Sequence, residues 1–364
     1  MADDRKLQRR DRSACDLLST LSPPLNSTRH SISFRAAPGA PSSAAVLLRP
    51  NLPVAQHRQL LCPAPLTMLF KLKFLKELPL YATVQPYRLH GFPDLPDDQQ
   101  TNCQYEHVDE VPADDLRDAA HVSRFEDEGF EFVNSPPRSP LRAAIFEDNT
   151  AASDQAVREY VQDTMDMVRK RLRPDSVVAI DWRFRRNDDN AFPQRLEGGD
   201  VRKQAIAVAT TAHCDFSYDG GFDRLRLHLS ADEMSAVEEG KMHAMIVNVW
   251  RPLRTVTSAP LVLADRRTIT KSDLVEADQV MTDRVNKTAY VYYRPTQKWY
   301  WMSNLRPNEA VIFATWRPET DSKFADYAPH VAAYLHCLDG SAPPRESVEV
   351  RMVTLFNTKE ALAT

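Results

Sequence analysis

The fold of this chain is decided by residues 204–216, which read QAIAVATTAHCDF. The β-branched and small apolar residues predict a strand over 204–212, and His213-Cys214-Asp215 follows at its end. Because side chains alternate along a strand, His213 and Asp215 should point the same way and Cys214 the opposite way. This is the arrangement that two metal ligands from one strand end require.

Three further residues extend this pattern. His330 comes much later and opens a second apolar strand, and Arg345 and Ser347 follow two residues apart, so they should share one face of a third strand. Two imidazoles and one carboxylate on one face of an octahedral iron(II) leave three positions open. The order His-x-Asp, His, Arg-x-Ser therefore predicts an iron(II) site whose open positions take 2-oxoglutarate and dioxygen (O2).

The predicted cosubstrate contacts depend on Arg345 and Ser347. A guanidinium suits the remote carboxylate of 2-oxoglutarate, and the serine hydroxyl can donate a further hydrogen bond to it. Each feature alone has a plainer interpretation: His-x-Asp pairs recur by chance, and Arg345 could form a surface ion pair with Glu346 or Glu349. The whole constellation favours the iron site.

The rest of the chain is rich in short β-type segments after one long helix. Apolar residues at helical spacing predict a helix over 154–172, and Ser230 with Glu233 predicts a capping box at the start of a shorter one. Strands are predicted at 176–183, 204–212, 224–229, 243–250, 260–264, 289–294, 298–302, 310–316, 329–335 and 347–356. This content predicts a mainly β protein with flanking helices around a double-stranded β-helix, or jelly-roll, core.

Composition divides the chain into three parts. Residues 1–67 are rich in Arg, Ser and Pro, and from residue 17 to 67 they lack acidic residues. This favours a disordered tail or a mis-annotated start, with a mitochondrial transit peptide as the alternative. Residues 68–150 predict a covering arm or lid with little regular structure, and residues 151–364 the jelly-roll oxygenase core.

Several function classes lack their signatures. The chain has only nine glycines and no glycine-rich dinucleotide loop, P-loop or nucleophile elbow. A net charge of -4 gives no case for nucleic acid, and no apolar run is long enough to span a membrane. The five cysteines form no C-x-x-C pair, so we expect neither a zinc ribbon nor a disulfide scaffold, but a reducing, cytoplasmic location.

Several other polar and aromatic residues can be interpreted either as site residues or as structural ones. Asn248 and Trp250 share one face of their strand, where they either contact cosubstrate or substrate or simply pack in the core. Core packing is favoured for Tyr292, Trp299 and Tyr300. We expect ordinary structural roles for three other histidines, His228, His243 and His336. Asp219 and Asp223 are predicted to be solvated in a Gly-Gly turn.

Five segments also carry a family resemblance. The strings AHCDFSYDGGFDRLRLHL, NVWRPL, KWYWMSNLRPNEAVIFATWRPETDS, APHVAAYLHC and PRESVEVR occur in this order within residues 125–357. Together they resemble the fungal non-haem iron hydroxylase/desaturase family, which includes an aspergillic acid hydroxylase and a gibberellin desaturase; a cephamycin 7α-methoxylation subunit is similar. The resemblance implies a secondary-metabolite oxygenase with its metal ligands at His213, Asp215 and His330 and its carboxylate anchor at Arg345. It also makes a homodimer a reasonable expectation.

Three functional hypotheses remain open at this level. The leading one is an iron(II)- and 2-oxoglutarate-dependent enzyme that hydroxylates or desaturates a small metabolite. The second keeps the iron without 2-oxoglutarate, as in endoperoxidation or oxidative rearrangement. The third is a non-catalytic partner subunit of a biosynthetic enzyme, against which an intact set of three ligands argues.

Overall fold

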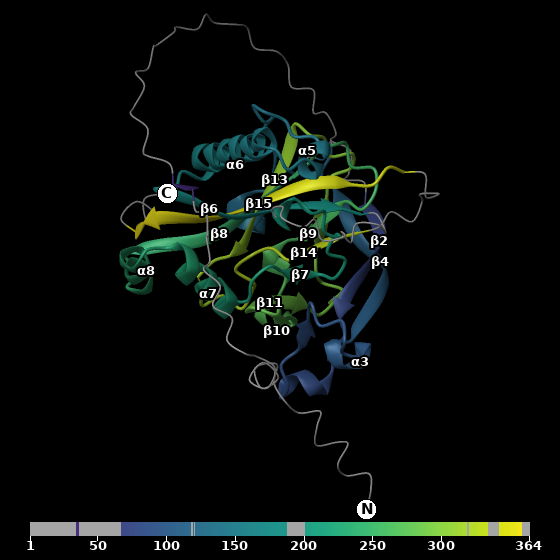
Figure 1. Cartoon of the computed structure of the whole chain (residues 1–364). Helices are drawn as coiled ribbons and strands as arrows, with labels where there is room; N and C mark the ends of the chain where they lie inside the picture. Colours follow the sequence, from purple (N-terminus) through teal and green to yellow (C-terminus); the bar gives the residue numbers. More distant parts are fainter. Residues whose placement is uncertain are drawn as a thin grey trace, which may run out of the picture.

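Two β-sheets lie face to face in the computed structural model, which describes residues 34–35, 67–117, 119, 121–187, 201–318, 320–333 and 342–358 (Figure 1). The first sheet has the strand order β1 (Phe34–Arg35), β6 (Ser176–Arg186), β15 (Glu346–Asn357), β8 (Met242–Pro252), β13 (Glu309–Trp316) and β5 (Phe130–Asn134). All of its neighbouring strands are antiparallel.

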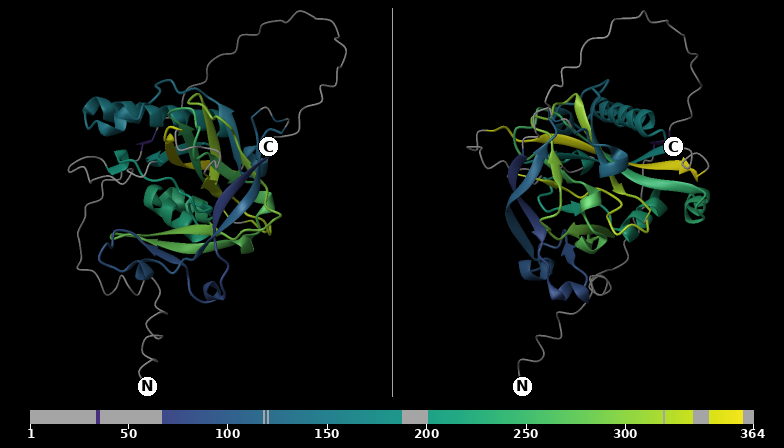
Figure 2. Two further views of the ribbon diagram at one scale, coloured as in Figure 1. Left: turned by 90° about the vertical axis from the view of Figure 1, so that its right-hand side faces the viewer. Right: turned by 180° about the vertical axis from the view of Figure 1, so that it is seen from behind.

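The second sheet is more strongly curled. Its order is β2 (Thr67–Leu75), β4 (Tyr105–Asp115), β12 (Trp299–Trp301), β9 (Leu261–Ala264), β14 (His330–Ala332), β7 (His213–Cys214), β11 (Val285–Val291), β10 (Leu274–Val280) and β3 (Tyr87–Leu89). Figure 2 shows β2 and β4, in blue, side by side along the molecule. The backbone N–H of Ala212 donates to the carbonyl of Lys73, so β2 lies beside the residues that directly precede β7.

Helices and short turns connect and cover the sheets. The longer helices are α6 (Ala151–Leu172), α7 (Tyr218–His228) and α8 (Ala231–Glu238). The short ones are η1 (Pro79–Ala82), α3 (Asp97–Gln100), α4 (Phe125–Glu128), α5 (Ala144–Glu147), η2 (Val201–Lys203), η3 (Arg266–Thr268) and η4 (Lys271–Asp273).

Helix α6 lies over the outer face of the first sheet (Figures 1 and 2). Thr150 caps its start by accepting from the backbone of Ser153, and Arg173 ends it in the left-handed conformation. Its buried face packs on valines of β8 and β15, while the residues between those valines face the second sheet. Each buried apolar side chain contributes roughly 1.5–3 kcal/mol to stability. Alternation thus sends Val249 and Val350 towards α6, and Asn248 and Arg351 into the space between the sheets.

The main-chain predictions are largely confirmed. The jelly-roll class, the helix over 154–172 (observed three residues earlier at its start) and the capping box of Ser230 and Glu233 all appear. Most predicted strands overlap with β6, β8, β9, β11, β12, β13, β14 and β15, although 289–294 shares only its first three residues with β11, and 334–335 lie outside the described residues. The predictions for residues 1–66 lie outside the described residues apart from the short β1.

Three local predictions were wrong. Residues 224–229 belong to helix α7, because Ser217 caps it and Phe222 and Leu225 recur at helical spacing. The Gly-Gly turn of Asp219 and Asp223 is part of that same helix, although both side chains are exposed as predicted. Residues 204–212 form no strand. They contain two isolated bridges, one between Ile206 and Arg185 and one between Thr211 and Lys73.

The expectation of little regular structure in residues 68–150 was also wrong. This segment contains β2, β3, β4 and β5. In β2, Lys71 and Lys73 alternate with buried Leu72 and Phe74, which is the ordinary pattern of a half-buried strand. Whether the segment acts as a lid stays a prediction.

Candidate metal centre

His213, Asp215 and His330 converge on one point between the two sheets. His213 of β7 and His330 of β14 are directly paired residues of adjacent antiparallel strands, and their ring centroids are 4.5 Å apart. Asp215 Oδ1 lies 3.7 Å from Nε2 of His213 and 3.9 Å from Nε2 of His330. One donor atom from each residue falls within 4.8 Å of the other two. This set of two imidazoles and one carboxylate fits a divalent iron site with open positions.

Backbone carbonyls orient both imidazole rings. His213 Nδ1 donates to the carbonyl of Thr211 at 2.8 Å, and His330 Nδ1 donates to the carbonyl of Ala328 at 3.4 Å. With the proton on Nδ1, the lone pair of each ring is on Nε2, the nitrogen that faces Asp215. The main chain therefore prepares both rings to bind a metal through Nε2.

Electrostatics favour the ligand forms of these side chains. Burial, together with the neighbouring His213, lowers the pKa of His330 to about 4, so its ring is neutral near pH 7. Burial raises the pKa of Asp215, but the Arg351 guanidinium and the two histidines outweigh it and hold that pKa well below its usual range. A neutral imidazole and an ionised carboxylate are the forms that bind metals.

The first sheet supplies a second layer of polar contacts. Asn248 Nδ2 donates to Asp215 Oδ2 at 3.4 Å, and Arg351 Nε lies 3.2 Å from the same oxygen. Glu349, two residues before Arg351, is buried and accepts from Arg351 and from Arg185 of β6. This buried ion-pair chain lies directly behind the carboxylate of the candidate centre.

A small cavity opens beside the two histidines. Arg345 borders it, with its guanidinium 5.2 Å from the ring centre of Trp250 and Nη1 donating to the carbonyl of Ala259 at 2.8 Å. Among the described residues, those that line it are Arg185, Ala209, His213, Trp250, Leu261, Phe313, His330, Ala332, Arg345 and Glu349. Ser347 of β15 is fully buried two residues after Arg345, outside the described lining of this cavity, and its hydroxyl has no hydrogen-bond partner among the described residues. A buried guanidinium and an unsatisfied hydroxyl suit an anionic ligand such as 2-oxoglutarate.

The structure brings most of the predicted site residues together. The three predicted ligands, Asn248, Trp250 and Arg345 all lie at the centre or its cavity. His228 lies in α7, exposed His243 lies in β8, and His336 is outside the described residues. Trp299 packs on Phe74 in the core.

Three neighbours of the centre were not predicted from the sequence: Arg185, Glu349 and Arg351. A signal was present in the string RESVEVR, where charged or polar residues alternate with Val348 and Val350. Such alternation in a central strand indicates a polar inner face. Only the three-dimensional arrangement identifies Asp215 as the partner of that face.

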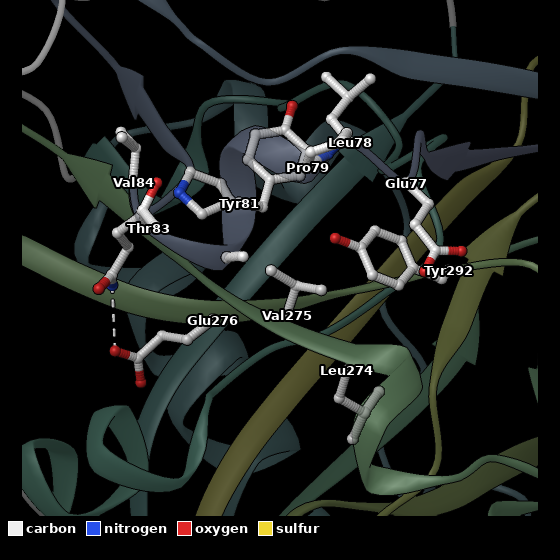
Figure 3. Close-up of a pocket in the computed structure, with 13 residues that line it drawn as sticks. Glu77, Leu78, Pro79, Tyr81, Thr83, Val84, Leu274, Val275, Glu276 and Tyr292 are labelled. Atoms are coloured by element: carbon white, nitrogen blue, oxygen red, sulfur yellow. Dashed lines mark hydrogen bonds between the residues drawn. The ribbon is translucent and has the colours of Figure 1, made fainter.

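A larger cavity of about 760 Å³ lies elsewhere, between residues 77–86 and the start of β10 (Figure 3). No residue of the candidate centre borders it. Its carboxylates are already paired: Glu276 accepts from Gln85 at 3.1 Å, and Glu77 forms an ion pair with Arg294 at 2.8 Å. Size alone does not make this cavity a competing site.

Comparison with known proteins identifies the family. A family model described as "Oxidoreductase/YMDC permease-like domain" matches residues 72–355. The chain belongs to this oxidoreductase family. Within the described residues, no helix has both the length and the apolar character needed to cross a membrane.

Curated relatives agree with the resemblance seen in the sequence. The hydroxylase/desaturase efuI of Hormonema carpetanum is 24% identical over 264 residues, 69% of this chain and 84% of that protein. The alpha-ketoglutarate-dependent dioxygenase tstK of Talaromyces stipitatus is 25% identical over 267 residues, 72% of this chain and 91% of that protein. The recognition of the fungal hydroxylase/desaturase family is confirmed.

A solved structure confirms the fold. The iron and alpha-ketoglutarate-dependent endoperoxidase NvfI is similar with a TM-score of 0.63 and 22% identity, covering 80% of this chain and 98% of that one. At this identity the likeness supports the jelly-roll architecture alone.

Proposed function

We propose that this member of the family is an iron(II)- and 2-oxoglutarate-dependent oxygenase that hydroxylates or desaturates a small secondary metabolite. The observation that carries the proposal is the convergence of His213, Asp215 and His330 beside a cavity that contains Arg345. The names of the curated relatives, hydroxylase/desaturase and alpha-ketoglutarate-dependent dioxygenase, support the same reaction class.

Each proposed role follows from the chemistry of the side chain. His213, Asp215 and His330 hold iron(II). Arg345 and Ser347 hold the far carboxylate of 2-oxoglutarate, the guanidinium through charge and the hydroxyl through one donated bond. When bound, the iron, 2-oxoglutarate and dioxygen together supply the oxidising power needed to break an unactivated C–H bond.

The remaining cavity residues position the reactants and exclude water. Trp250, Phe313 and Leu261 are buried and line the cavity, so they limit solvent beside the metal ligands. We assign substrate contact to Trp250, and orientation of Asp215 to Asn248, whose amide donates to that carboxylate.

Endoperoxidation is a second candidate outcome, because the name of the relative NvfI gives that reaction. The name of that enzyme joins endoperoxidation with dependence on alpha-ketoglutarate, so the cosubstrate alone does not separate the outcomes. Product analysis does: hydroxylation adds one oxygen atom, desaturation removes two hydrogens, and endoperoxidation adds two oxygen atoms.

Anaerobic absorption spectroscopy tests the proposal. Apo-protein loaded with iron(II) should develop a metal-to-ligand charge-transfer band when 2-oxoglutarate is added. Arg345→Ala should lose the band at the same cosubstrate concentration, whereas Arg254→Ala, which removes an exposed arginine, should keep it.

The other outcomes select the rival hypotheses. Iron binding without the band would favour an oxygenase that does not use 2-oxoglutarate. Failure of the wild-type chain to bind iron would remove the enzymatic proposal and leave the partner-subunit hypothesis. Substrate screening by succinate release follows only if the band appears.

We propose further that the protein works in the cytoplasm as a homodimer. The five widely spaced cysteines, which form no disulfide scaffold pattern, support the first part of this proposal. The family resemblance supports the second part. Light scattering after size-exclusion chromatography measures the oligomeric state, and a monomer mass would contradict the second part of the proposal. Cell fractionation tests the first.

A further inference from the structure

Arg351 occupies a central place on the inner face of the first sheet. It lies in β15 directly between Asn248 of β8 and Asp181 of β6 in the strand register. Its side chain is 13% exposed, and its Nη1 lies 3.2 Å from Asp181 Oδ2. The residue is therefore fixed within a row of polar side chains that faces the candidate metal centre.

The two oxygens of Asp215 have different surroundings. Arg351 Nε at 3.2 Å and Asn248 Nδ2 at 3.4 Å both approach Oδ2. Oδ1 is the oxygen that faces Nε2 of His213 and of His330. The first sheet thus supplies two donors to Oδ2, whereas Oδ1 is the oxygen that faces the imidazoles.

The second contact of Arg351 with Asp215 uses a nitrogen that Glu349 shares. Nη2 lies 3.3 Å from Oδ1, but the same nitrogen lies 2.6 Å from Oε1 of Glu349. Arg185 in turn holds Glu349 with both Nε, at 3.1 Å, and Nη2, at 2.9 Å. Arg351 therefore contacts both oxygens of Asp215, but its Nη2 is shared with Glu349, and only Oδ2 receives a second donor from the first sheet, Asn248.

We propose that Arg351 is a positioning residue that fixes the Asp215 carboxylate so that Oδ1 is the oxygen presented to the metal. The inference rests on the proposed function, because it assumes that Asp215 is a ligand. A carboxylate held in this way binds through one oxygen and leaves the other coordination positions open for cosubstrate and dioxygen. Partners of metal ligands that act in this way typically change metal affinity about 10–100-fold when removed.

Cobalt(II) binding to the full-length apo-protein tests this role without turnover. Arg351→Gln removes the charge and the planar fork, so we expect cobalt(II) affinity to fall about 10–100-fold and the d–d absorption bands to shift as Asp215 changes its binding mode. Arg351→Lys keeps the charge without the fork, so a smaller loss is expected there. Wild-type affinity and an unchanged spectrum in Arg351→Gln would overturn the proposal.

Arg183→Gln is the matched control. Arg183 lies on the same strand as Asp181 and donates to it at 3.0 Å, as Arg351 does from the neighbouring strand, but its recorded ion pair is with Asp181 and not with Asp215. Cobalt(II) affinity should stay at the wild-type value in this variant. An equal loss in Arg183→Gln and Arg351→Gln would show a general effect of the ion pairs and overturn the positioning role.

The remaining outcomes are also decisive. If Arg351→Gln does not fold, as judged by circular dichroism, Arg351→Lys decides alone: wild-type affinity and spectrum there overturn the proposal. If the wild-type protein itself binds no cobalt(II) or iron(II), the proposed function fails first. If the wild-type protein binds cobalt(II) and the Arg351 variants bind it equally well, only this inference fails.

Discussion

His213 and His330 lie directly opposite each other in neighbouring antiparallel strands, with their ring centroids 4.5 Å apart. Directly paired residues point to the same face of a sheet, so the pairing itself brings both imidazoles to one point. Asp215, two residues after His213, completes the set from the same face. The register of one strand pair therefore determines whether a metal site exists.

Replacing either histidine should abolish metal binding. His330→Ala and His213→Ala each remove one of three ligands, so we expect iron(II) affinity to fall by more than the roughly 10–100-fold typical of changes outside the ligand set. Metal content after dialysis measures this. His243→Ala, an exposed histidine of β8, is the control and should bind iron normally. Full iron retention in both ligand variants would contradict the assignment.

Ser347→Ala should separate cosubstrate binding from stability. The buried hydroxyl has no partner among the described residues, so its removal should leave the free energy of unfolding unchanged or raise it by about 1 kcal/mol. The dissociation constant of 2-oxoglutarate should rise about 2–10-fold, the value of one hydrogen bond. Chemical denaturation and titration of the charge-transfer band measure the two quantities.

Thr354→Val provides the comparison on the same strand. Thr354 is buried and its hydroxyl donates to the carbonyl of Met245 at 3.3 Å. Here stability should fall and 2-oxoglutarate affinity should not change. A Ser347→Ala variant that behaves like Thr354→Val would mean that Ser347 has a structural role only.

The stability of the metal-free protein should decrease in mild acid. Burial lowers the pKa of His330 from 6.5 to about 4, so between these values the unfolded chain binds a proton that the folded chain does not. The free energy of unfolding therefore has its full value above about pH 6.5 and falls by on the order of 3 kcal/mol as the pH is lowered towards 4. Denaturation curves at pH 7 and pH 5 should show that the wild-type protein loses more unfolding free energy between these values than His330→Gln does. Equal losses would contradict the shifted pKa.

The sequence was sufficient for the fold class because its signals are local. The alternation in β8 and β15 and the helical spacing in α6 are visible in the residues themselves. Helix α7 was mistaken for a strand because Leu225, Leu227 and Leu229 also alternate, and the cap at Ser217 was overlooked. Strand β10 was not predicted because half-buried Glu276 and buried Asp278 interrupt its apolar residues.

The metal ligands were predictable because their residue types and order are specific to that chemistry. The contacts of Arg351 were not, because they depend on how two sheets pack. Arg351 approaches Asp215 from the opposite sheet, and 136 positions separate them in the chain. No local pattern specifies such a contact, and a strand arginine is more often solvent-exposed than paired with a metal ligand.

Gly221→Ala should weaken both the fold and the metal centre. Gly221 lies in α7, and a Cβ built there would be 2.1 Å from the ring of Trp316, far inside contact distance. Trp316 Nε1 donates to the carbonyl of Tyr218 at 2.9 Å, so the ring holds the first turn of the helix. Forcing the two apart should cost about 1–3 kcal/mol of folding free energy. Because α7 begins three residues after Asp215, the displacement should also lower iron(II) affinity.

Leu227→Ala, at an exposed position of the same helix, should change neither the folding free energy nor the iron(II) affinity. Denaturation and cobalt(II) titration of both variants measure the effects, and a Gly221→Ala protein as stable as wild type would show that Trp316 can move aside without cost.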